Sequence, residues 1–150
     1  MKTIFDKTNR DELINRINSL DKNSVRQWGK MEVCQMAKHC TIWDEWVLGK
    51  KKTGYKQSLL GLIFGKMALK SQVKDDRPIK KNMPTTGYFI VRDKTGDIEM
   101  LKNTWIKLIG EYEHFSNPDF VHDFFGRMTV DEIGIFAYKH ADHHLRQFNA

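Results

Sequence analysis

The chain has 150 residues, of which 40% are hydrophobic and 29% are charged. This length predicts a single domain, residues 1–150, that buries a core without disulfides, and the composition excludes extensive disorder. The net charge of +6 is compatible with a nucleic-acid partner. We do not expect one, because the basic residues are scattered or lie in expected loops such as 50–52 and 77–81, and no nucleic-acid-binding motif is present.

The sequence also argues against secretion and against a membrane partner. Residues 1–7 lack the apolar core of a signal peptide. The longest apolar run, residues 59–65, is far shorter than the roughly 20 residues that cross a bilayer. Cys34 and Cys40 lie six residues apart in one expected helix, where their side chains diverge, and Cys40 is expected to fill the core. Free thiols fit a reducing compartment, so we expect a cytoplasmic protein.

Two helices are expected in the first third of the chain. Apolar residues spaced by three and four from Leu13 to Leu20 predict a short helix, with its N-cap within residues 8–11. A second helix is predicted from residue 30 to about residue 48, with one apolar stripe, and Gly49 is expected to end it.

The middle of the chain predicts one helix and one long connection. Residues 57–73 are mostly apolar and predict a helix that Gly61 and Gly65 interrupt. Residues 74–92 are rich in turn-forming residues and predict a crossover connection, in which residues 88–91 are extended.

A third long helix is predicted from about Ile98 to Tyr112, because its apolar residues repeat every three or four positions. Asp93 or Thr95 is expected to cap its N-terminus. The following loop, residues 114–125, is unusually aromatic, and we expect it to fold back onto the protein.

The last helix has the clearest start signal. Thr129 and Glu132 form a predicted capping box, and the helix is expected to end near Phe148. Four long helices, one long crossover connection, an additional short helix and almost no strand signal predict an all-α fold, a four-helix bundle.

Histidines on two of these helices are the most informative residues. His140 and His144 are one turn apart on the apolar arc of the last helix, and His39 borders the apolar arc of the second helix. Three imidazoles are the usual protein ligands of a catalytic divalent-metal site. The alternative is that each is an ordinary buried histidine with a hydrogen bond, but burying three together without a common partner leaves their hydrogen-bonding capacity unsatisfied.

Other polar residues receive less weight. His143 falls at the rim of the cluster, and His114 and His122 are expected at the surface. Asp142 lies on the far face of the last helix, which leaves Glu32 or a backbone carbonyl to fix the tautomers of the three rings.

Four segments resemble a known family. Trp28-Gly29-Lys30-Met31, Gln35-Met36-Ala37-Lys38-His39-Cys40, Phe124-Phe125-Gly126-Arg127-Met128-Thr129 and the stretch from His140 to Phe148 resemble a bacterial branch, of uncharacterised function, of the DinB-like (YfiT-like) superfamily of helical metal-dependent proteins. The likeness covers most of the chain and is weakest between residues 50 and 94.

The resemblance implies a four-helix bundle with a long crossover, frequently a homodimer, and a divalent metal held by His39, His140 and His144. It supports a site more than a reaction. We expect a zinc- or nickel-dependent transferase or hydrolase that acts on a small molecule, either by thiol transfer or by hydrolysis with a water whose pKa the metal lowers toward about 7. The alternative is a non-catalytic helical module that binds a ligand or partner in a cleft or at the aromatic loop.

Overall fold

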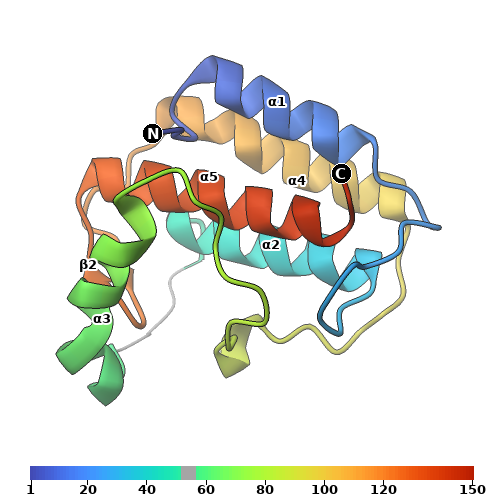
Figure 1. Ribbon diagram of the computed structural model, residues 1–150. Helices are drawn as coiled ribbons and strands as arrows, with labels where there is room; N and C mark the ends of the chain where they lie inside the picture. The colour runs from blue at the N-terminus through green and yellow to red at the C-terminus, as the bar shows by residue number, and fades with distance from the viewer. Residues whose placement is uncertain (52–56) are drawn as a thin grey trace.

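The computed structural model describes residues 1–51 and 57–150. Within these residues the chain forms five α-helices, two short 3-10 helices and one two-stranded hairpin (Figure 1). Their bounds are α1 (Lys7–Asn18), α2 (Val33–Val47), α3 (Leu59–Val73), η1 (Gly87–Phe89), α4 (Ile98–Glu111), η2 (Tyr112–His114), β1 (Val121–His122), β2 (Gly126–Arg127) and α5 (Val130–Gln147). Lys52, part of the expected basic loop, lies outside the described residues.

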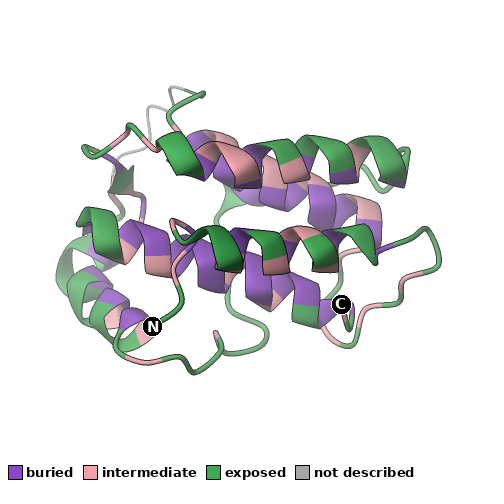
Figure 2. Ribbon diagram, turned by 90° about the horizontal axis from the view of Figure 1, so that it is seen from above, coloured by how far each residue is buried: buried purple, intermediate pink, exposed green. Residues whose placement is uncertain are grey.

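The helices α1, α2, α4 and α5 lie side by side around a shared apolar core (Figure 1). Helix α2 packs along α4 and contacts α5, while α1 contacts both α4 and α5. Figure 2 shows that these helices bury their inward sides and expose their outward sides. The fully buried side chains include Met36, Trp105 and Leu145. The predicted all-α class is therefore confirmed.

Two predicted N-caps are wrong, and the reason is the same in both cases. Helix α1 is capped by Asp6 and not from within residues 8–11, and α4 is capped by Asp97 and not by Asp93 or Thr95. Each true cap has extended backbone angles, and its carboxylate accepts a hydrogen bond from the amide two residues further on. Several capping-type residues stand close together at both places, so backbone conformation selects among them.

The capping box that begins α5 is confirmed. Thr129 accepts a hydrogen bond from the amide of Glu132 at 3.2 Å, and Glu132 accepts one from the amide of Thr129 at 2.8 Å. A second capping box, between Glu32 and Gln35, begins α2 three residues later than predicted. Helix α2 thus starts at Val33, within two turns of His39.

The connection between α3 and α4 differs from its prediction at one place. Tyr88 and Phe89 are not extended, because they belong to η1, which buries Phe89 against Trp46 with ring centroids 5.0 Å apart, whereas Ile90 has extended backbone angles. The aromatic loop does fold back, as predicted: β1 lies within it and pairs with β2, which directly follows it, and Phe120 and Phe125 are buried.

The two cysteines are unpaired, and Cys40 is buried, as expected. Among the residues that the structure describes, none of the helices combines the length and the apolar character needed to cross a membrane.

Candidate metal centre

Three histidines meet between α2 and α5. His39 lies on α2, and His140 and His144 lie one turn apart on α5. Each offers one ring nitrogen that lies within 4.8 Å of the nitrogens of the other two. The structure therefore brings together the three residues that the sequence singled out, close enough to hold one metal ion.

Burial keeps these three rings neutral. His39 and His144 are 4% and 7% exposed, and His140 is half-buried. Burial lowers the pKa of all three, and the neighbouring imidazoles of His144 and His39 lower the pKa of His140 further. Neutral imidazole is the form that binds a metal, so few protons need to leave the site at neutral pH.

The tautomer of His39 follows from its hydrogen bond. Its Nδ1 lies 2.8 Å from the carbonyl oxygen of Phe89. A carbonyl can only accept, so Nδ1 carries the hydrogen and Nε2 presents its lone pair to the cluster. The backbone carbonyl that we predicted as an orienting partner is thus present. Glu32 is not one, because it caps α2 and pairs with Arg26 at 2.7 Å.

The tautomer of His144 is fixed by Gln147. The side-chain nitrogen of Gln147 donates to the carbonyl of Trp28 at 2.9 Å, which turns its amide oxygen toward Nδ1 of His144 at 3.1 Å. An amide oxygen accepts, so Nδ1 of His144 carries the hydrogen and its Nε2 is available to an ion.

Gly29 makes room for this arrangement. It has a φ of +77°, and a Cβ added there would lie 2.5 Å from Nε2 of Gln147. Only glycine combines that backbone conformation with such a close approach. The turn at Trp28 and Gly29 is therefore a structural part of the site, although neither residue offers a ligand atom.

The position of His140 completes the geometry. Its Nε2 lies 3.2 Å from Nε2 of His39. Because Nε2 of His39 presents a lone pair, a proton or a cation has to lie between it and Nε2 of His140. Nitrogens bound at 2.0–2.1 Å to one tetrahedral ion are about 3.3 Å apart, so the observed spacing suits a shared metal. The ring of Trp43 stacks on His140 at 4.2 Å between centroids and holds its plane.

The donor set suits some metals better than others. Imidazole nitrogens favour zinc, nickel, copper and iron over magnesium or calcium. Three protein ligands also leave at least one coordination position open to water or substrate, unlike a closed structural zinc site. Cys40 does not belong to the cluster: its thiol lies 3.8 Å from Sδ of Met36, and burial raises its pKa.

The other histidines lie outside the cluster. His143 is half-buried at its rim, with its ring edge-on to Trp28 at 5.7 Å, and His114 is exposed, as predicted. The prediction that His122 lies at the surface is wrong. Its side chain is 12% exposed and packs on Phe125, with ring centroids 4.4 Å apart, because the hairpin turns it inward.

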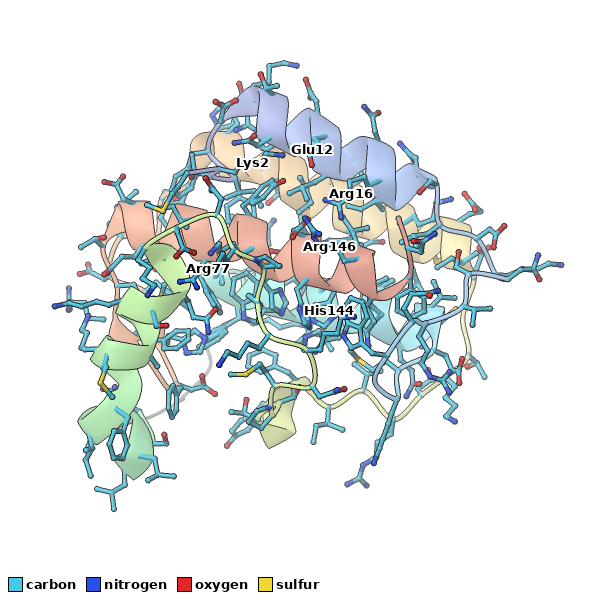
Figure 3. The ribbon with its side chains drawn as sticks, viewed as in Figure 1. Lys2, Glu12, Arg16, Arg77, His144 and Arg146 are labelled. Atoms are coloured by element: carbon cyan, nitrogen blue, oxygen red, sulfur yellow. The ribbon has the colours of Figure 1, made fainter. Side chains whose placement is uncertain are left out.

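The opposite side of α5 carries charges instead. Asp142 faces away from the histidines, as predicted, and accepts hydrogen bonds from Arg16 and Arg146 at 2.8 Å each. Figure 3 shows Arg146 and His144 on different sides of α5. A cavity of about 450 Å³ between α1 and α5 is lined largely by such ion pairs and by none of the histidines. It is separate from the candidate metal centre.

Two residues at the site had a sequence signal that we did not use. Gln147 stands three positions after His144, and Trp43 stands four positions after His39, so each shares a helix face with a candidate ligand. The carbonyl of Phe89 had no such signal, because it lies 50 residues from His39 and any residue supplies the same group.

We expect the Gln147→Ala variant to bind zinc about 10- to 100-fold more weakly than the wild type. The change removes the acceptor that orients His144, and partners of this kind contribute about that much to metal affinity. Competition with a chromogenic chelator measures the loss.

Gln27→Ala is the matched control, because the Gln27 side chain is exposed and donates only to the nearby carbonyl of Val25. Gly29→Ala should weaken zinc binding as Gln147→Ala does, since its Cβ displaces the Gln147 amide. Equal affinities in Gln147→Ala and Gln27→Ala would show that Gln147 does not orient the ligand.

The fold and the histidine cluster define an all-α protein with a candidate three-histidine metal centre. The chain belongs to the family described as "Protein of unknown function (DUF1569)", whose family model matches residues 2–150. Comparisons with curated proteins and with solved structures found no match. Because the family description names no reaction, the chemistry has to be argued from the site itself.

Proposed function

We propose that this protein is a divalent-metal-dependent enzyme whose ion, zinc or nickel, is held by His39, His140 and His144. The observation that carries the proposal is the approach of the three ring nitrogens to within 4.8 Å of one another. A bound ion would supply Lewis-acid chemistry, lowering the pKa of a water or a substrate thiol so that it becomes a nucleophile at neutral pH. The reaction proposed is hydrolysis of a small molecule or transfer of a thiol.

The chain's own residues prepare the site for this chemistry. The Phe89 carbonyl and the Gln147 amide each hold the hydrogen on Nδ1 of one ring, which points Nε2 inward. Burial excludes water from two of the three rings and keeps them uncharged. The half-buried position of His140 gives the cluster an accessible side, where a small molecule can approach.

The arrangement of the helices supports the family resemblance. We propose that α1, α2, α4 and α5 form a DinB-like four-helix bundle, with residues 74–97 as its long crossover connection. In such bundles, cofactors and metals bind between facing helices, as the cluster between α2 and α5 would require.

Metal content and activity test the proposal together. Protein purified without a metal-affinity tag should carry close to one divalent ion per chain, or take up added zinc or nickel to that level. The loaded protein is then screened against hydrolase substrates and against thiols with electrophilic acceptors, and turnover should depend on the ion. A chain that neither carries nor takes up an ion contradicts the metal site and favours a non-catalytic binding module. Stoichiometric metal without turnover of any substrate contradicts the enzymatic role alone.

A further inference from the structure

Helix α3 exposes a large apolar surface. Six of its apolar side chains are between 48% and 75% exposed, and all lie in its first nine residues. These residues, which we call the α3 apolar face, are Leu59, Leu60, Leu62, Ile63, Phe64 and Met67. A soluble monomer rarely leaves so many large apolar side chains exposed together, so this surface indicates a binding function.

The helix cannot turn to bury this face. Its other side docks through Gly61 and Gly65, where an added Cβ would lie 2.3 and 2.2 Å from the carbonyl oxygen of Phe124. The prediction that the two glycines interrupt the helix is therefore wrong. They lie within a continuous helix and allow it to approach the hairpin backbone. Leu69 and Val73 anchor its C-terminal half in the core. Figure 1 shows the N-terminal end of α3 projecting away from the other helices.

The charged residues of α3 itself have one sign, whereas Lys50 and Lys51, which precede it, pair with Glu111 and Glu45. Residues 46–74 contain seven lysines and no other charged residue, whereas the rest of the chain has 18 basic and 19 acidic residues. The whole net positive charge of the protein thus belongs to this segment. Lys66, Lys70 and Lys74 follow one another at four-residue intervals toward the C-terminal end of α3, on the same side of the helix as the apolar face, and all three are exposed.

We propose that the α3 apolar face inserts into the surface of membranes that contain anionic lipids, with the lysines of the helix contacting the headgroups. The apolar side chains gather at the projecting N-terminal end of α3 and the lysines follow toward its C-terminal end. This end can therefore enter the membrane interface while the lysines stay at the level of the headgroups. A cationic surface gains further affinity from anionic lipids. Our expectation of no membrane partner came from the length of the apolar run, which excludes a spanning helix but not an interfacial one.

A second copy of the chain is a poorer occupant of this face. A symmetric dimer brings the same patch of both copies together, so the lysines of α3 would face those of the partner. Residues 46–74 hold no acidic residue that could pair with them. The face also projects outward at its end, which suits insertion into lipid better than a flat protein contact (Figure 1).

Co-sedimentation with vesicles tests this proposal. The full chain should bind vesicles of phosphatidylglycerol and phosphatidylcholine more tightly than vesicles of phosphatidylcholine alone, and added salt should reduce the difference. The affinity of the Leu60→Ser, Ile63→Ser double variant for anionic vesicles should be at least about tenfold lower than that of the wild type. Lys70→Glu with Lys74→Glu should lose the preference for anionic vesicles. All four substituted positions are exposed, so both double variants should keep the core intact.

Two controls separate this binding from other effects. Met100→Ser changes an apolar residue of α4 that is 67% exposed, and it should bind vesicles like the wild type. His140→Ala should also bind them unchanged, because the α3 apolar face contains no metal ligand. Absence of binding to anionic vesicles overturns the proposal. So does a concentration-dependent dimer in sedimentation velocity that Leu60→Ser, Ile63→Ser dissociates, since the face would then be covered by a second copy.

Discussion

Replacing His140 with alanine is expected to weaken zinc or nickel binding by more than about 100-fold. His140 lies close to both other ligands, with its Nε2 3.2 Å from that of His39 and its ring 4.7 Å from that of His144, centroid to centroid. Its loss leaves two ligands, and even the loss of a group that only orients a ligand costs 10- to 100-fold. Isothermal titration of metal-free protein measures the affinity directly.

Thermal unfolding gives an independent measurement. A ligand that binds only the folded state stabilises it by about 2.7 kcal/mol at 100 times its dissociation constant. Added zinc should therefore raise the Tm of the wild type and leave that of His140→Ala unchanged.

Two other histidines provide matched controls for this variant. His114 is exposed, and His143 is adjacent to His144 in sequence but lies at the rim against Trp28. His114→Ala and His143→Ala should keep the zinc affinity of the wild type within a few-fold. If His143→Ala lost as much affinity as His140→Ala, the assignment of the three ligands would be wrong.

The second large effect is a pH dependence of stability that comes from Asp44. This carboxyl is 2% exposed, and it accepts hydrogen bonds from the Tyr112 hydroxyl at 2.7 Å and from Nε1 of Trp105 at 2.9 Å. Burial raises its pKa from 3.8 to about 7, against the lowering effect of these two hydrogen bonds. The folded state therefore holds this proton more tightly than the unfolded state does.

The sign of the effect follows from proton linkage. Between pH 3.8 and about 7 the folded state binds more protons at Asp44 than the unfolded state, so the stability from this group falls as pH rises. It is fully present below pH 3.8 and is lost once the pH passes about 7. A pKa difference of this size corresponds to roughly 4 kcal/mol.

The Asp44→Asn variant isolates this contribution. Asparagine keeps the shape of the protonated acid, and its amide nitrogen can donate to the Tyr112 hydroxyl. Urea unfolding at pH 4 and pH 8 should show that the variant gains roughly 4 kcal/mol relative to the wild type between the two pH values. The histidine cluster is common to both proteins, so its own pH dependence cancels in this difference.

Asp119→Asn serves as the comparison, because the Asp119 side chain is 83% exposed. Its stability relative to the wild type should change little over the same range. If the free energies of unfolding of the wild type and of Asp44→Asn differed by the same amount at all pH values, Asp44 would stay ionised in the folded protein.

Local sequence patterns were sufficient for the fold class and for the candidate ligands. The Thr129–Glu132 capping box and the apolar periodicity of α5 depend on neighbours within one or two turns. The same periodicity places His140 and His144 on the inward face of that helix without any tertiary information. His39 could be included because the apolar stripe of its own helix runs beside it.

Local patterns failed where several residues of the same type compete or where one backbone conformation decides. Asp93, Thr95 and Asp97 are all good caps, and only the extended backbone at Asp97 selects it. The hairpin of β1 and β2 has two-residue strands, too short for an alternating pattern to appear.

By itself the sequence determined that this protein is helical and which three imidazoles face inward, because helix geometry fixes the direction of side chains a few residues apart. Only the tertiary structure decided that these rings share one point in space, that the carbonyl of Phe89 and the amide of Gln147 orient two of them, and that the apolar side of α3 stays exposed. Contacts between residues 50 to 119 positions apart depend on how the whole chain packs. No local propensity encodes them.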